Sequence, residues 1–307
     1  MAYPLPVDPE TGLFIVLDGH GEHGDVVSNE LLAQLYEQLS ACAWSTNAEN
    51  GALSENAVAS QLVSSFETAH SRLVDFEIDP TTQMAAGKES GAAAVVALLG
   101  RGRLTVAHSG DCRAVLGTMD TSSQKLKTVE LTHDHKLEDP EEAKRLAACG
   151  AYVRPTIEEP YFSPARVYKD ATKPSLGPGL TMARSLGDMD ADEIGVIPTP
   201  EVSFRTLSAN DKFIVLASDG VWEFLSSEHV VEIVGGFLER GEPAVAATRF
   251  LIAKAAMAWR VEEADYRDDI TAIVLYLNAH NLYNLPGGLV GPTGYGESDS
   301  LTKGFKG

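Results

Sequence analysis

Aspartate recurs at the ends of apolar segments of this chain, at positions suited to binding a cation. Four aspartates are placed in this way: Asp18, Asp111, Asp219 and Asp268. An aspartate at the rim of a buried strand is held rigidly, and an adjacent glycine lets a ligand approach the backbone closely. Where several such rims meet, the carboxylates repel one another unless a cation neutralises them.

The ligand type indicates which cation and which chemistry to expect. Carboxylate oxygens are hard ligands that favour Mg²⁺ or Mn²⁺ over Zn²⁺, and no cysteine or histidine ligand set is recognised that would compete. Two such ions can bridge a water molecule, lower its pKa and hold the oxygens of an in-line phosphoryl displacement. Each motif alone has a simpler interpretation, since Asp-Gly is usually a turn and a lone histidine such as His20 is usually structural. The prediction of a hydrolytic two-ion centre depends on the whole set and its order.

Strands and helices must position these residues. Segments rich in β-branched and aliphatic residues predict strands at 13–18, 92–99, 104–108, 113–116, 212–218 and 270–277. Apolar residues at helical spacing predict helices over 27–39 and 58–73, and a last long helix over 243–261. Asp139 and Ser226 are expected to cap two further helices. Runs of strands with separate helix pairs indicate an α+β fold.

Two segments lack such periodicity. Residues 154–179 carry several prolines and glycines and are expected to form a surface flap. Residues 284–307 are rich in glycine, proline and serine and are expected to be a flexible tail. Residues 1–283 would then form a single domain.

Composition limits the partners. The 24 basic and 44 acidic residues give a formal charge of −20, which disfavours nucleic acid and anionic membranes. Neither a long apolar run nor a signal peptide is recognised. Three scattered cysteines, Cys42, Cys112 and Cys149, favour a reducing compartment, so an intracellular protein, cytoplasmic or nuclear, is expected.

Six ordered motifs resemble the type 2C (PPM) family of metal-dependent protein phosphatases. They lie at residues 18–21, 109–116, 131–150, 182–188, 217–223 and 268–271, and the match extends over about 13–277. Asp-Gly-His-Gly at 18–21 resembles the hallmark of the family. The segment 109–116 resembles its Gly-Asp-Ser-Arg-Ala turn, with Cys112 in place of serine.

The resemblance implies a four-layer α-β-β-α sandwich of two antiparallel sheets flanked by helices, with metal ions at one end. It implies that Asp18, Asp219 and Asp268 bind metal through their carboxylates, and that Gly19 binds through its carbonyl oxygen. The cofactors implied are two Mg²⁺ or Mn²⁺ ions.

The resemblance also implies an additional, looser third metal site at Asp111 and Glu223, where glutamate replaces a common aspartate. His20 matches a residue thought to protonate the leaving alkoxide. An imidazole suits that role near neutral pH.

The resemblance is incomplete upstream of Asp18. Family members usually carry an earlier strand with an arginine for the substrate phosphate and a Glu-Asp pair for metal. Here no arginine or lysine precedes Asp18, and Asp8 and Glu10 lie in a segment that predicts a turn. We therefore expect either a truncated product or a degenerate phosphatase. Arg184 is a rival phosphate contact, but its motif predicts a structural turn before Asp188.

Two functions are considered. The first is hydrolysis of phosphoserine and phosphothreonine in phosphoprotein substrates by a metal-activated water, carried out by a monomer. The second is a catalytically weak or inactive phosphatase-like module that binds or regulates. The retained Asp18, Asp219 and Asp268 favour the first, and the absent upstream arginine and Glu-Asp pair favour the second.

Overall fold

The computed structural model describes residues 2–5, 8, 11–42, 44, 53–79, 84–85, 87–158, 163–172 and 177–277. Its first sheet has the strand order β1 (Ala2–Pro4), β2 (Thr11–His20), β5 (Gly91–Gly100), β6 (Arg103–Ser109) and β13 (Glu201–Thr206), with β12 (Leu186–Gly187) also paired to β5. All of these pairs are antiparallel.

The second sheet has four antiparallel strands. They follow the order β15 (Ala272–Tyr276), β14 (Asp211–Ala217), β7 (Arg113–Met119) and β8 (Leu126–Glu130). All six predicted strands are therefore present, although β15 begins two residues after the predicted start at 270. Strands β8 and β13 escaped prediction because their partly exposed residues give no continuous apolar run.

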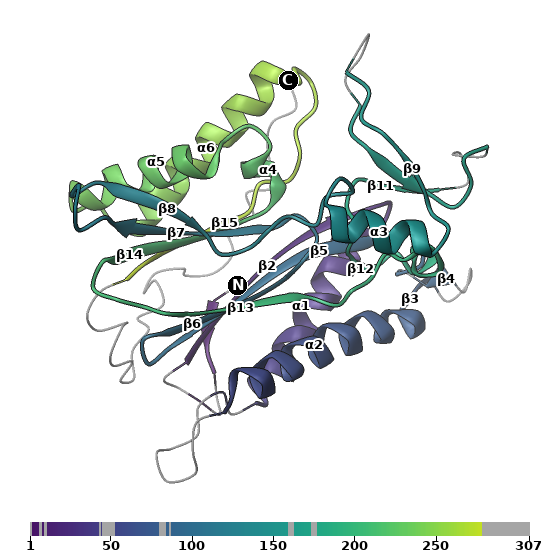
Figure 1. Cartoon of the computed structure of the whole chain (residues 1–307), viewed down its shortest axis with the longest axis horizontal. Coiled ribbons are helices and arrows are strands. Elements are labelled where there is room, and N and C mark those ends of the chain that lie inside the picture. The colour runs from purple at the N-terminus through teal and green to yellow at the C-terminus, as the bar shows by residue number, and fades with distance from the viewer. Residues whose placement is uncertain are drawn as a thin grey trace.

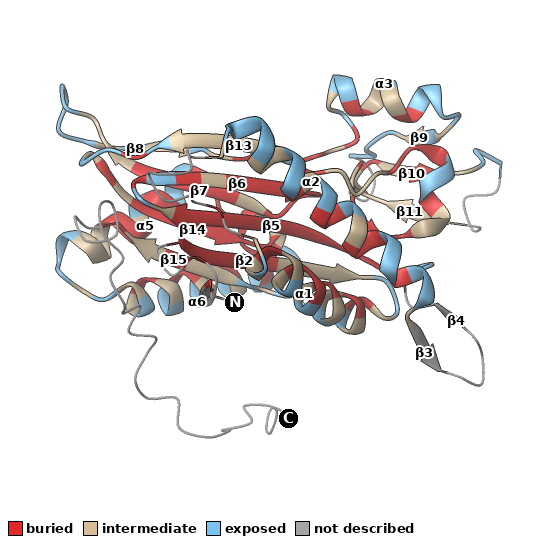
Figure 2. Cartoon of the chain, turned by 90° about the horizontal axis from the view of Figure 1, so that it is seen from below, coloured by how far each residue is buried: buried red, intermediate tan, exposed pale blue. Residues whose placement is uncertain are grey.

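Alternation along the strands divides the core into layers. In β2, Leu13 and Ile15 face the helices, whereas Phe14 and Val16 face the second sheet. Successive side chains of a strand point to opposite faces, so one apolar strand serves both interfaces. Figure 2 shows the buried residues gathered on the strands of both sheets and on the helix faces that meet them.

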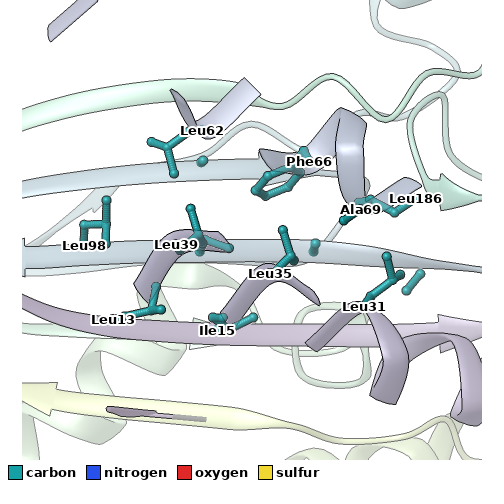
Figure 3. Packing of buried hydrophobic residues seen from close by; sticks show 14 of the residues in the cluster. Leu13, Ile15, Leu31, Leu35, Leu39, Leu62, Phe66, Ala69, Leu98 and Leu186 are labelled. Carbon is teal, nitrogen blue, oxygen red and sulfur yellow. The ribbon is translucent and has the colours of Figure 1, made fainter. Parts of the chain in front are cut away.

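Helices α1 (Gly24–Ser40) and α2 (Glu55–Arg72) cover the outer face of the first sheet. In α1 the predicted stripe is fully buried, and its members are Val27, Leu31, Leu35 and Leu39. Figure 3 shows leucines of α1 directed at Leu13, Ile15 and Leu98 of the strands, with Leu62 and Phe66 of α2 alongside. The helical period therefore supplies the apolar face that the sheet requires.

Helices α5 (Ser227–Glu239) and α6 (Ala244–Glu262) cover the second sheet. The short helix α4 (Asp219–Trp222) follows β14 at once. In Figure 1 these helices lie on one side of the paired sheets, and α1 and α2 lie on the other. The predicted four-layer α-β-β-α sandwich is confirmed, and no helix of the described part is long and apolar enough to cross a membrane.

The predicted flap is more ordered than its composition indicates. It contains a three-stranded sheet, with β10 (Arg166–Tyr168) between β9 (Tyr152–Arg154) and β11 (Pro178–Leu180). Helix α3 (Pro140–Ala148) precedes it, and both share a small apolar cluster that includes Leu146 and Val167. Strands of three residues are too short to show a period, so this small sheet could not be predicted from the sequence pattern.

The described residues also form short elements: the 3₁₀ turns η1 (Leu73–Asp75) and η3 (Met189–Ile194), and the hairpin β3 (Glu77–Asp79) with β4 (Met84–Ala85). The predicted tail at 284–307 lies outside the described residues.

Candidate metal centre

Two aspartates from different sheets meet at one end of the sandwich. Asp18 lies near the end of β2, and Asp219 opens α4 directly after β14. Burial raises the pKa of both carboxyl groups, and the two groups share a hydrogen bond. Oδ1 of Asp219 is buried and has no hydrogen-bond partner within the described structure. The surrounding protein therefore does not compensate two negative charges at this pair, and the two carboxyl groups share a proton instead.

Asp111 and Asp268 lie close enough to act on this pair. The charges of both raise the pKa values of Asp18 and Asp219 further. Asp111 is buried in the turn between β6 and β7, and Asp268 is half-buried in the segment between α6 and β15. The structure thus brings together the four aspartates that the sequence singles out, from four segments far apart in the chain.

Hydrogen bonds fix the segment that carries Asp268. The Ser218 hydroxyl donates to the carbonyl oxygen of Asp269 (3.1 Å), and it accepts the backbone N–H of Thr271 (3.0 Å). The indole Nε1 of Trp259 donates to the carbonyl oxygen of Gly220 (2.7 Å). The end of β14 is therefore tied both to α6 and to the start of β15.

Gly19 has a packing reason to be glycine. A Cβ at this position would collide with the backbone carbonyl of Gly24, because the start of α1 lies directly against the end of β2. The close approach of two backbones requires the missing side chain. The role of the Gly19 carbonyl as a metal ligand stays a prediction.

Glu223 lies at the rim of the cluster. Its backbone N–H donates to the carbonyl oxygen of Asp219 (2.8 Å), so it stands one helical turn further along the same short helix. Its side chain is exposed. No hydrogen bond or ion pair of the described residues joins it to Asp111.

His20 is held by a carboxylate that the sequence prediction missed. Its Nε2 lies 2.6 Å from Oδ2 of Asp188, which is 3% exposed and also accepts the Ser185 hydroxyl (2.7 Å). Burial alone would lower the pKa of His20, but Asp188 outweighs it and the pKa is raised. Asp188 adopts a left-handed backbone (φ 49°), which is uncommon outside glycine and concentrates at functional sites.

The neighbouring strand makes room for Asp188. A Cβ on Gly91, the first residue of β5, would collide with Oδ2 of Asp188. The partner of His20 stands 168 residues away in the chain, so no local spacing could reveal it. The one available signal was the motif at 182–188, which we interpreted only as a turn.

A lysine reaches the same centre. The ammonium of Lys136 lies 2.7 Å from Oδ2 of Asp111. Burial works against the charged form of Lys136, but Asp111 outweighs it and raises the pKa. Lys136 belongs to the motif at 131–150, yet nothing in that motif identified it as a site residue.

Arg184 is structural, as its motif predicts. Its guanidinium forms an ion pair with Glu142 (Nη2 to Oε1, 2.6 Å) and donates to the carbonyl oxygen of Thr199 (2.9 Å). Arg145 pairs with the same carboxylate (2.7 Å). Together the two arginines lower the pKa of Glu142 to about 2 despite its burial. Arg184 therefore joins α3 to the segment before β13.

A cavity of about 600 Å³ lies beside His20. One wall comes from β11 and the residues that follow it, and the other includes His20 and Asp188. Two cationic residues, Lys88 and Arg166, line it as well, together with the acids Glu89 and Asp190. The cavity could accept part of a substrate next to the aspartate cluster.

Three further residues are of types that bind metals, but their ring nitrogens are not oriented to bind one ion together. Ligand atoms of His108, His135 and Glu201 lie within 4.8 Å of one another, a cluster that the sequence did not reveal. Nδ1 of His135 accepts the backbone N–H of Gly110 (3.1 Å), so in the neutral ring the proton sits on Nε2, the atom nearest to Glu201. The two imidazoles are also stacked, with centroids 4.4 Å apart, so their lone pairs do not converge.

The aspartate cluster, by contrast, suits a hard divalent cation. Its donors are carboxylate oxygens, and one of them is a buried oxygen without a hydrogen-bond partner in the described structure. Burial and then mutual repulsion raise the pKa values of Asp18 and Asp219. A divalent cation would relieve both features. Asp18 and Asp219 are the residues best placed to hold it, with Asp268 and Asp111 beside them.

Comparison with known proteins agrees with a metal-dependent site. The family profile described as Protein phosphatase 2C matches residues 7–263. Probable protein phosphatase 2C 72 of Arabidopsis thaliana is 36% identical over 270 residues, which cover 87% of this chain and 77% of that protein. Probable protein phosphatase 2C 12 of Oryza sativa subsp. japonica is 41% identical over 194 residues, which cover 63% of this chain but only 47% of that protein.

A solved structure shares the fold. The serine-threonine phosphatase 2C of Toxoplasma gondii superposes with a TM-score of 0.68 at 20% identity, covering 88% of this chain and 86% of that one. At this identity the likeness shows the architecture alone. The profile match and the relatives, however, span most of the residues described above. The chain therefore belongs to the protein phosphatase 2C family of metal-dependent serine/threonine protein phosphatases.

Proposed function

We propose that this chain hydrolyses phosphoserine and phosphothreonine esters in proteins. The observation that carries the proposal is the buried Asp18–Asp219 pair, whose uncompensated charge lies next to the His20–Asp188 pair. A cation site and a proton donor in one place are what metal-assisted hydrolysis of an ester requires. The two relatives named above are described as probable protein phosphatases, which supports catalysis over a purely binding role.

In this mechanism Asp18, Asp219 and Asp268 would hold two Mg²⁺ or Mn²⁺ ions, with the carbonyl oxygen of Gly19 as a further ligand. Asp111 and Glu223 would hold a third ion more loosely. The bound ions would supply Lewis acidity that lowers the pKa of the attacking water. The aspartates determine where the cations would bind, because the strands and the short helix α4 fix the positions of their carboxylates.

His20 provides the proton for the leaving serine or threonine oxygen. Asp188 fixes the direction of the ring and favours the protonated imidazolium, because its carboxylate lies 2.6 Å from Nε2 of His20. Because the imidazolium carries a proton on each ring nitrogen, Nδ1 donates its proton to the leaving oxygen while Nε2–H stays bonded to Asp188. Asp188 is therefore a positioning residue, and His20 is the general acid.

The substrate phosphate also needs a cationic partner. Arg184 is engaged with Glu142 and Thr199, whereas Lys88 and Arg166 line the cavity beside His20. Lys88 is exposed and forms no ion pair with any described residue, while Arg166 already donates to the carbonyl oxygen of Gly179 (2.5 Å). We assign the phosphate contact to Lys88, since its ammonium needs no prior partner to be displaced.

We also propose that the protein is a monomer in a reducing intracellular compartment, cytoplasmic or nuclear. The free cysteines Cys42, Cys112 and Cys149 support the reducing compartment. The net charge of −20 is poorly suited to nucleic acid, so phosphoproteins are the proposed substrates.

The decisive experiment measures release of phosphate from a phosphothreonine peptide as a function of Mn²⁺ and Mg²⁺. We expect activity that disappears with EDTA, and a loss of about 100-fold or more in kcat for His20→Gln. Lys88→Met should raise KM more than it lowers kcat, and Lys212→Met serves as the matched control. Absence of hydrolysis at every metal concentration, in a protein that is folded, would favour the binding module instead.

A further inference from the structure

Lys136 is the one lysine or arginine that pairs with any of the four clustered aspartates in the described part of the chain. Its Nζ lies 2.7 Å from Oδ2 of Asp111. The Asp111 side chain is 2% exposed, and the Lys136 side chain is 40% exposed. The contact therefore joins a buried anion to a cation that reaches it from the surface.

The backbone imposes this contact. The N–H of His135 donates to the carbonyl oxygen of Gly110 (3.0 Å), and the N–H of Gly110 donates to Nδ1 of His135 (3.1 Å). One residue earlier, Asp134 accepts two bonds from the Arg113 guanidinium (2.9 and 2.7 Å). The loop between β8 and α3 is thus fixed to both sides of the turn that carries Asp111. Lys136 is consequently held near Asp111 by the fold and is not a surface side chain that happens to rest there.

The location of this ammonium matters for cation binding. Asp111 lies close enough to Asp219 for its negative charge to raise the pKa of that carboxyl group, an effect second to burial. The ammonium compensates part of that potential without using Asp18, Asp219 or Asp268. A divalent cation that used Asp111 would meet a positive charge already bonded to the same carboxylate, and like charges in a partly buried site repel strongly.

We propose that Lys136 is a tethered counter-ion of Asp111 that competes with the outermost metal ion, so that the fold itself keeps the Asp111–Glu223 site weak. The inner ions at Asp18 and Asp219 bind without this competition. Occupation of the outer site requires Nζ of Lys136 to give up Oδ2 of Asp111. The inference rests on the proposed function, because it concerns an ion of the same centre.

Titration calorimetry with Mn²⁺ on the metal-free full chain tests the proposal. Lys136→Met should tighten the weakest binding step by about tenfold or more, because it removes a fixed positive charge next to the site. The tighter steps should change much less. In EDTA the same variant should melt at a lower temperature than the wild type, since Asp111 loses its buried partner. Lys212→Met, at the opposite end of β14 from Asp219, should change neither quantity.

Two further variants make the result specific. Lys136→Arg keeps the charge and should bind the weakest ion as poorly as the wild type does. Asp111→Asn combined with Lys136→Met should abolish the tightening, since the shared carboxylate is gone. An unchanged weakest step in Lys136→Met would overturn the proposal. A weaker step would also overturn it, because Lys136 would then be holding Asp111 in place for the metal.

The outcome is separable from that of the proposed function. If Asp219→Asn leaves all Mn²⁺ binding intact, the metal centre itself is misassigned and the proposed function fails. If the inner ions bind and the phosphopeptide is hydrolysed, but Lys136→Met binds like the wild type, only the present inference fails.

Discussion

Asp219 shows how one residue at this site serves binding at the expense of stability. Its carboxyl group is buried, and burial together with the charges of three other aspartates raises its pKa. Asp219→Asn should therefore weaken Mn²⁺ binding by at least about tenfold in calorimetry. The same variant should raise the melting temperature in EDTA, because it removes repulsion between buried carboxylates.

Those two effects together exclude a trivial explanation. A variant that binds poorly because it misfolds would melt at a lower temperature, not a higher one. Asp75→Asn, which removes an exposed carboxylate in η1, should alter neither quantity. Unchanged Mn²⁺ affinity in Asp219→Asn would show that Asp18 and Asp219 do not share a cation.

His135 predicts a dependence of stability on pH. Burial, together with the neighbouring His108 and Arg184, lowers its pKa from 6.5 to about 2, against the opposing effect of Glu142. The unfolded chain therefore takes up this proton first as the pH falls below 6.5. The neutral ring therefore contributes to the free energy of unfolding above pH 6.5, and about 2 kcal/mol of this contribution is lost by pH 5.

The measurement is the free energy of urea unfolding of the wild type and of His135→Asn between pH 7.5 and 5, in EDTA. The difference between the two proteins should shrink as the pH falls, because asparagine cannot take up the proton but can accept the Gly110 N–H. Comparison at each pH cancels the contributions of Asp18 and Asp219, whose raised pKa values act in the opposite direction. A pH-independent difference would contradict the prediction.

At the scale of elements, the start of α3 is the best place for a test. Asp139 caps this helix by accepting the N–H groups of Glu141 and Glu142 (2.9 and 3.1 Å), as the sequence predicts. Asp139→Ala should cost about 1 kcal/mol in urea unfolding, whereas Asp139→Asn should cost much less, because asparagine also caps. Equal losses in both variants would show that charge, and not capping, decides the effect.

This cap has consequences beyond the helix. Glu142, in the first turn of α3, holds both Arg184 and Arg145. The flap cluster around Leu146 and Val167 packs on the same helix. A loosened α3 would therefore also loosen the β11 wall of the cavity beside His20, which hydrogen exchange in residues 178–182 would detect.

At the scale of the whole molecule, the four layers are complete by residue 277. The last described strand, β15, ends at Tyr276 and is already paired with β14. Removal of residues 284–307, whose composition offers little to bury, should therefore shift the melting temperature by no more than about 1 °C. A loss of several degrees on differential scanning fluorimetry would show that the segment packs on the sandwich.

The layered core was largely predictable from the sequence. The stripe in α1 and the alternation in β2 are local periods, and burial of one face dictates them whatever the partner. The cap residues Asp139 and Ser226 were equally clear, because a cap acts on backbone groups two or three residues away. The short strands β9, β10 and β11 were not, because three residues cannot establish a period.

The aspartates of the site followed from type and position, since each stands where an apolar strand begins or ends. Their partners did not. The His20–Asp188 pair joins residues 168 apart, and it exists because Asp188 takes a left-handed backbone against a glycine of β5. The Lys136–Asp111 pair depends on how one loop hydrogen-bonds to another. The sequence by itself determined the strands, the helices and the carboxylates; only the tertiary structure decided which charges face one another, because that depends on packing between segments distant in the chain.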